Sequence, residues 1–245
     1  MKTLLLIVIM FCRLSASAET IDEIFDKMEK NQKPMTQRSE ITQTIYLTSG
    51  EERQSRLISY GKDGSDKGLM EYISPARIKG MKMLMLNEGD DIWFYSPRTA
   101  RVRKIASHQR KQSVNGSDFS YEDFSANDMR DDYETKLVGT EKIDDTDCYK
   151  IKLTAKDKDK TYSSVNFWVD KERYIPLKAE YFDEDRELWK VLTMQGFIKI
   201  KDYWTAKTIE MKNVQKGSRT VMIMDKIEYD IPMDDMLFSQ RNLKK

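Results

Sequence analysis

The sequence has little of the chemistry that most enzymes and metalloproteins need. It holds one histidine and 2 cysteines in 245 residues. Too few ligands are therefore present for a histidine-rich metal cage, a zinc ribbon or an iron–sulfur site. Acid–base or nucleophilic catalysis through histidine rests on His108 alone. We therefore expect no catalytic residue, no metal and no cofactor, and a protein that is not an enzyme.

An excess of charge of one sign is also missing. Lys and Arg together number 42 and Asp and Glu 41, so the large charged fraction of 34% nearly cancels. Proteins that bind polyanions over a broad surface carry a strongly basic field instead. The composition therefore disfavours nucleic acid as a partner.

No apolar run is long enough to cross a membrane as a helix, which needs about 20 residues. The run from Leu4 to Phe11 follows a basic start at Lys2 and precedes the small-x-small pattern Ala16-Ser17-Ala18. We predict a cleavable secretory signal peptide over residues 1–18 and an exported domain over residues 19–245. Peripheral contact is then the only membrane contact that we expect.

Loss of residues 1–18 would leave Cys148 as the only thiol, so no disulfide could form within the chain. This favours a bacterial periplasm over a disulfide-rich extracellular scaffold. Cys148 occupies an alternating, strand-like segment. We interpret it as a small buried apolar residue rather than a reactive thiol.

The start of the exported chain has the pattern of an amphipathic helix that ends near Lys33-Pro34. Thr20 and Glu23 form a capping box at its beginning. The apolar residues that follow have the i, i+3, i+4, i+7 spacing of one buried stripe: Ile21, Ile24, Phe25 and Met28.

From about residue 36 onward the apolar period changes to two, which predicts roughly a dozen short antiparallel strands separated by turn signals. Such a pattern is typical of a meander, a barrel or a sandwich. Residues 115–129 lack the alternation and begin with turn residues. There we predict a short helix or ordered loop that crosses the sheet. The strand segments are 41–47, 56–60, 68–74, 79–86, 91–96, 101–106, 133–142, 148–155, 163–169, 176–182, 189–195, 205–212 and 220–229.

Three methionines, Met81, Met83 and Met85, alternate on one face of a predicted strand whose other face is also apolar. Strands that are apolar on both sides have both faces covered, or one face lines a cavity. Plain core is one interpretation, and an adaptable apolar binding surface is the other. We predict an apolar cavity lined by Met81, Met83, Met85, Trp93, Tyr95 and Trp168.

A basic stretch without carboxylates follows the tryptophan-containing strand. One interpretation is a solvated edge whose charges pair locally, each exposed pair stabilising by less than ~1 kcal/mol. The other is contact with lipid headgroups or an acidic partner, since arginine suits bidentate phosphate recognition. The residues concerned are Arg98, Arg101, Arg103, Lys104, Arg110 and Lys111.

An ordered set of segments resembles the bacterial outer membrane lipoprotein-sorting protein family, the LolA-like branch of the LolA/LolB superfamily. The chain also closes as such chains do, with Ile231-Pro232, Asp234 and Leu237-Phe238. The resembling segments are Ser74–Leu84, Ile92–Pro97, Arg101–Ile105 and Gly116–Asp123.

The resemblance implies a mainly β fold: a single open, incomplete antiparallel β-barrel of about eleven strands with helices covering its concave face. It also implies a Gram-negative periplasmic carrier whose apolar cavity takes acyl chains of lipoproteins or lipids for transport towards the outer membrane. The alternative is an accessory, non-enzymatic subunit of an RND-type inner-membrane exporter or an envelope sensor. An enzyme that uses His108 or Cys148 is the third option.

Overall fold

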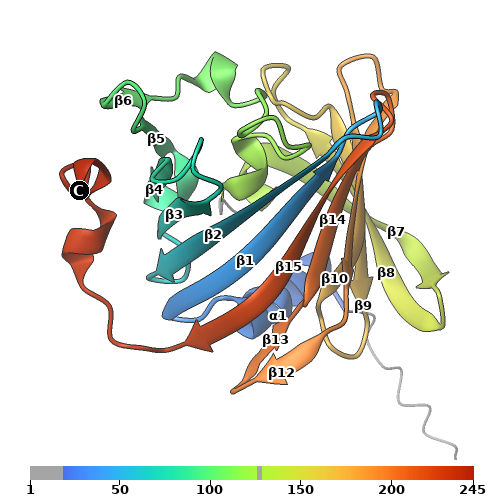
Figure 1. The fold of residues 1–245 in the computed structure, drawn as a ribbon. Coiled ribbons are helices and arrows are strands. Elements are labelled where there is room, and N and C mark those ends of the chain that lie inside the picture. Colours follow the sequence, from blue (N-terminus) through green and yellow to red (C-terminus); the bar gives the residue numbers. More distant parts are fainter. Residues whose placement is uncertain (1–18, 126–128) are drawn as a thin grey trace, which may run out of the picture.

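The computed structural model describes residues 19–125 and 129–245, so the expected signal peptide lies outside the described residues. One large antiparallel sheet, strongly twisted and curved, forms most of this part of the molecule (Figure 1). The two α-helices that the described residues contain are α1 (Ile21–Gln32) and the short α2 (Met129–Asp132).

The strands fall on the segments in which apolar and polar residues alternate, because successive side chains of a strand point to opposite faces of a sheet. The strands are β1 (Thr36–Tyr46), β2 (Glu52–Lys62), β3 (Lys67–Ser74), β4 (Lys82–Leu86), β5 (Asp91–Ser96), β6 (Arg101–Lys104), β7 (Tyr133–Ile143), β8 (Thr146–Ala155), β9 (Ser164–Asp170), β10 (Pro176–Phe182), β11 (Leu188–Gln195), β12 (Ile198–Ile200), β13 (Tyr203–Thr205), β14 (Thr208–Asn213) and β15 (Ser218–Tyr229).

Thirteen of the strands in the described residues make the main sheet, in the order β6-β5-β4-β3-β2-β1-β15-β14-β11-β10-β9-β8-β7. The prediction of about eleven strands was therefore too low, and the small β12–β13 hairpin was not foreseen. The sheet is not closed. Its two edges, β6 and β7, are consecutive in the chain, so residues 105–132 must pass from one edge to the other.

Helix α1 begins with the capping box predicted from Thr20 and Glu23, whose side chains and backbone N–H groups bond reciprocally. Its apolar stripe is buried, with Ile24 0%, Phe25 8% and Met28 7% exposed. These side chains belong to the main core, together with residues of β1, β9 and β11. The predicted opening helix is thus confirmed, and it covers one face of the sheet (Figure 1).

The two faces of the sheet belong to different apolar clusters. We call the face that carries the main core, with Met70 and Met83, the inner face, and the opposite face the outer face. On the same two strands, Leu69 and Leu84 point the other way and belong to a second cluster. Both faces of this half of the sheet are therefore covered, as strands apolar on both sides require.

The segment that joins the two edges covers the inner face along with α1. Val114 and Phe119 are buried in the main core. Asp118 fixes the segment to β15: its carboxylate accepts bonds from the hydroxyls of Ser218, at 2.5 Å, and Thr220, at 2.7 Å. The prediction of a short helix or ordered loop is confirmed for residues 115–125, which form turns and one short 3-10 helix (Glu122–Phe124), whereas residues 126–128 of the predicted segment lie outside the described residues.

The C-terminal residues after β15 lie on the outer face beside β2 to β5 (Figure 1). Phe238 and Leu243 are 5% and 0% exposed and pack with Leu69 and Leu84. Lys62 holds Asp235 in an ion pair of 2.9 Å. This segment therefore shields apolar strand residues that would otherwise face water.

Candidate ligand cavity

A cavity of about 360 Å³ opens on the inner face between α1 and strands β9, β10 and β11. Its volume lies within the range of small-molecule sites. Two residues of the α1 stripe form one wall, because positions three apart share a helix face. The apolar lining residues include Phe25, Met28, Phe167, Pro176, Leu192 and Met194.

Methionine and leucine give these walls a flexible, polarizable surface that adapts to apolar ligands of different shape. Leu192 and Met194 both lie on β11, two residues apart, so they present side chains to the same face. The alternation of β11 and the helical spacing of α1 thus place these apolar side chains on the walls of one cavity.

Charged side chains at the margin of the cavity are largely engaged with one another. Lys33 and Glu29 form an ion pair of 2.7 Å, four residues apart on α1. Arg130 bonds Asp26 at 2.8 Å, and its guanidinium lies 5.6 Å from the ring centre of Phe25. The apolar interior therefore has a polar border, the arrangement that suits an amphiphilic ligand.

Asp123, which lines the cavity, forms a buried ion pair of 3.1 Å with Lys190. The Tyr162 hydroxyl donates to Asp123 at 2.6 Å, and Lys190 donates to that hydroxyl at 2.9 Å. The backbone N–H of Ser120 and its hydroxyl donate to the same carboxylate at 2.7 and 2.8 Å. Every charge in the cluster has a partner, as burial demands.

A second, smaller chamber of about 100 Å³ shares four lining residues with the cavity: Asp123, Ser125, Met129 and Tyr181. Burial, and then the nearby Asp123 carboxylate, raises the pKa of Tyr181 well above its usual range, so its hydroxyl is protonated. The buried hydroxyl of Ser125 has no hydrogen-bond partner among the described residues. These groups give this part of the site its polar character.

The structure divides the six residues predicted to line a cavity. Met81, Met83 and Met85 all pack with the main core on the inner face. Met83 is 2% exposed and fully enclosed, and the three methionines lie outside the lining of the cavity described above. Their predicted contact with a ligand is untested and stays a prediction.

The predicted aromatic residues lie elsewhere. Trp93 and Tyr95 alternate with Ile92 and pack in the outer cluster beneath the C-terminal segment. Trp168 is 2% exposed in a third cluster with Cys148. The six residues therefore do not share one surface, because the sheet places adjacent apolar residues on opposite faces.

The six residues of the predicted basic contact differ in their environment. Arg103 and Lys104 are engaged with Tyr121, at 3.5 Å, and with Asp91. Arg110 donates to the backbone oxygen of Asp90 at 2.6 Å. Arg98, Arg101 and Lys111 are exposed, and no ion pair links them to another described residue.

The two residues of the enzyme alternative are separated. His108 is exposed on a turn beside a groove of about 710 Å³. Cys148 is buried, and burial raises the pKa of its thiol. No cluster of three metal-binding side chains occurs within residues 19–125 and 129–245. In the same ranges, no helix has the length and apolar character needed to span a bilayer.

The sequence pattern alone did not bring Leu192, Met194, Phe167 and the Asp123–Lys190 pair together as parts of one site. The signal for the apolar residues was present, since β9 and β11 alternate. Which of two apolar faces meets α1 depends on tertiary packing, and alternation alone does not determine it.

The comparisons place the chain in a family. A family model described as that of an uncharacterized protein matches residues 64–245. A DUF1329 family protein from Desulfovibrio piger is 30% identical, with a TM-score of 0.83 over 90% of this chain and 96% of the other. A domain assigned to outer membrane lipoprotein sorting in Vibrio parahaemolyticus is 25% identical, with a TM-score of 0.85 over 91% and 97%.

The chain belongs to the same family as the DUF1329 protein of Desulfovibrio piger. A LolA superfamily protein from Nitrosomonas europaea, 22% identical, has the same fold, with a TM-score of 0.76 over 92% of this chain and all of the other. No curated protein sequence matches the chain. The LolA-like resemblance derived from the sequence is confirmed.

Proposed function

We propose that this LolA-like protein is a periplasmic carrier that holds an acyl chain of a lipoprotein or lipid in the cavity between α1 and β9–β11. The observation that carries the proposal is the apolar cavity of about 360 Å³ on the inner face of an open sheet. In this proposal the sheet acts as an incomplete barrel, with α1 and the crossing segment over its concave face. Transport towards the outer membrane is part of the proposal.

The energetics of burial support a function that needs no bond making or breaking. Each methylene removed from water stabilises a complex by about 0.8 kcal/mol, so a chain of about a dozen carbons gains roughly 10 kcal/mol. The entropy of association and of ordering the chain opposes this gain. A carrier needs only a small net gain, because it must release its ligand as well as bind it.

Native mass spectrometry of the exported protein, purified from a bacterial periplasm, tests the proposal. We expect a bound or exchangeable acyl-containing molecule, which solvent extraction followed by lipid analysis would identify. Protein that carries no such molecule and takes up none from added lipid would contradict the carrier function.

A second candidate function is an accessory subunit that docks on an inner-membrane RND-type exporter or envelope sensor. Arg98 and Arg101 favour it, because both are exposed, Arg98 in the turn before the edge strand β6 and Arg101 at the start of that strand. An R98E/R101E variant separates the two functions. Loss of co-purification with a membrane partner while acyl binding survives would support the accessory subunit.

A further inference from the structure

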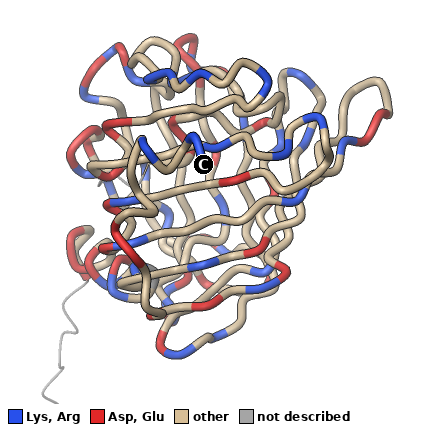
Figure 2. Tube along the Cα trace, turned by 60° about the vertical axis from the view of Figure 1, so that its left-hand side comes forward, with Lys and Arg blue, Asp and Glu red and all other residues tan. Residues whose placement is uncertain are grey.

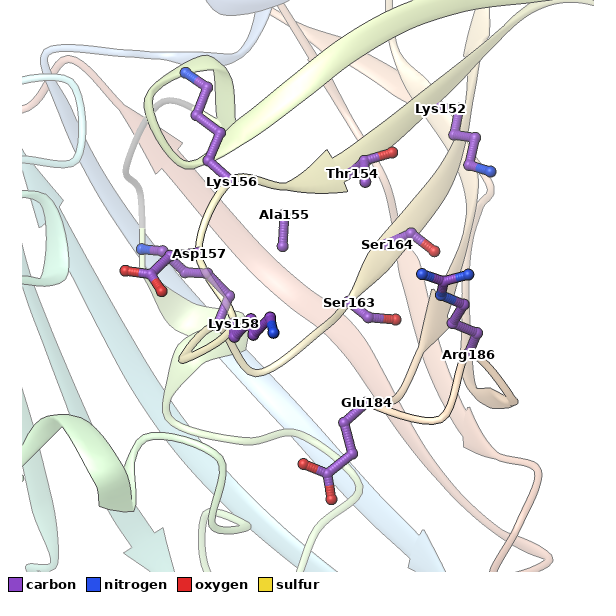
Figure 3. A pocket seen from close by; sticks show the side chains of 11 residues that line it. Lys152, Thr154, Ala155, Lys156, Asp157, Lys158, Ser163, Ser164, Glu184 and Arg186 are labelled. Atoms are coloured by element: carbon purple, nitrogen blue, oxygen red, sulfur yellow. The ribbon is translucent and has the colours of Figure 1, made fainter.

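A basic groove of about 800 Å³ lies away from the proposed acyl cavity, beside the ends of β8 and β9 and the turn before β11 (Figure 3). Of the 11 residues that line it, Lys152, Lys156, Lys158, Lys160 and Arg186 are basic. Two lining residues, Asp157 and Glu184, are acidic. Outside this groove and the basic stretch over residues 98–111, both signs of charge are interspersed along most of the chain (Figure 2).

Three of the five basic side chains of the groove are not neutralised as Lys150 is on the same strand β8. Lys136 and Lys152 are direct partners across β7 and β8, and both are exposed. Like charges in such positions destabilise a sheet. By contrast, Lys150 on the same strand is bonded to Glu141 at 2.7 Å, and within the described residues no ion pair reaches Lys152, Lys158 or Arg186.

Hydroxyl groups lie between the unpaired cations. Thr154 and Ser164 are partners across β8 and β9, and Figure 3 shows the side chain of Ser164 between those of Lys152 and Arg186, with Thr154 beside Lys152. A guanidinium group binds phosphate oxygens in bidentate fashion, and hydroxyl and ammonium groups add further donors. The groove therefore has the donor chemistry that recognises a phosphate group.

The loop that lines the groove is attached to the border of the acyl cavity. Lys156 donates to the backbone oxygens of Arg130 and Asp131, at 2.8 and 3.1 Å, and Lys160 pairs with Asp132 at 2.5 Å. Arg130 belongs to the cavity lining. A membrane held at the groove would thus lie near the site from which an acyl chain enters or leaves, which favours a lipid headgroup over a soluble anion.

We propose that this groove binds the phosphate of an anionic lipid headgroup and docks the carrier on a membrane surface. The reason for docking rests on the proposed carrier function. Headgroup binding at the groove needs no ligand in the acyl cavity. A protein that bound no acyl chain could therefore still bind vesicles, and the two proposals can fail independently.

The test is sedimentation of the full exported protein with vesicles of phosphatidylglycerol and phosphatidylcholine, or of phosphatidylcholine alone, at low and high salt. We expect binding that needs phosphatidylglycerol and weakens as salt screens the charges. The K152E/K158E/R186E variant should bind at least about tenfold more weakly, because each basic side chain near an anionic surface contributes to binding.

The matched control is K79E/K199E/K212E, which makes the same change in net charge at exposed lysines outside the groove. Its vesicle affinity should stay close to that of the wild type. If the groove variant does not fold, K152Q/K158Q/R186Q replaces it. Equal losses in groove and control variants, or equal binding to both vesicle types, would overturn the proposal. So would stabilisation by millimolar inorganic phosphate without vesicle binding, which would indicate a soluble anion as the ligand.

Discussion

Lys190 and Asp123 form an ion pair in the interior, with side chains only 4% and 3% exposed and 3.1 Å between Nζ and Oδ2. The pair links β11 to the segment that crosses the inner face. Ser120 and Tyr162 satisfy the remaining oxygen positions of the carboxylate. Because Asp123 also lines the cavity, this pair anchors one part of the cavity wall to β11.

Substitution of Lys190 by methionine should destabilise the protein strongly, because it leaves the Asp123 carboxylate buried without its countercharge. We expect the free energy of unfolding to fall by about 3–5 kcal/mol. Denaturant titration of K190M measures it, with K212M at an exposed lysine as the matched control. Equal effects of the two substitutions would show that the buried pair contributes nothing to stability.

Glu19 should make the docking of α1 depend on pH. Hydrogen bonds from Lys27, Tyr149 and Tyr174 lower the pKa of the Glu19 carboxyl from 4.5 to about 2. A carboxyl whose pKa is lowered on folding stabilises the folded state above its unfolded pKa, and loses this effect as the pH falls through the folded value. The stabilisation should therefore be complete at neutral pH and should disappear between pH 4.5 and about 2.

The measurement compares thermal unfolding of the wild type and E19Q across this pH range. The wild type should be more stable at neutral pH, and the two should converge near pH 2. E52Q, at an exposed glutamate, is the control and should follow the wild type throughout. A constant difference between E19Q and the wild type at all pH values would refute this role of Glu19.

The C-terminal segment should contribute substantially to stability through Phe238. The side chain is 5% exposed and packs against Leu69 and Leu84 on the outer face. Its removal in F238A should cost about 3–5 kcal/mol of unfolding free energy. M236A is a suitable control, since Met236 is 60% exposed on the same segment. The account of the outer face fails if calorimetry gives the same melting temperature for both variants.

The sequence predicted most of the local structure because local rules determine it. The capping box at Thr20 and Glu23 marked the beginning of α1, and alternation marked every strand of the main sheet. The assignment of faces was less successful for Trp93, Tyr95 and Trp168. Both faces are apolar on these strands, so alternation separates two sets of residues without showing which set faces α1.

The position of the cavity required long-range information. Met28 and Met194 lie more than a hundred residues apart in the sequence, yet both line the cavity. They meet because β11 pairs with β14 while α1 folds back over the inner face. The C-terminal cover of the outer face has the same origin, since Phe238 and Leu69 are far apart in the sequence and meet in one cluster only through the tertiary fold.

The most direct test of the central claim is the affinity of the exported protein for a fluorescent fatty acid, measured for the wild type, M194W and M236W. Tryptophan at position 194 fills part of the cavity and should weaken binding by about tenfold or more, equivalent to about two methylene groups left unburied. The same substitution at exposed Met236 should leave the affinity unchanged. Undiminished binding by correctly folded M194W would contradict the assignment of the acyl chain to this cavity.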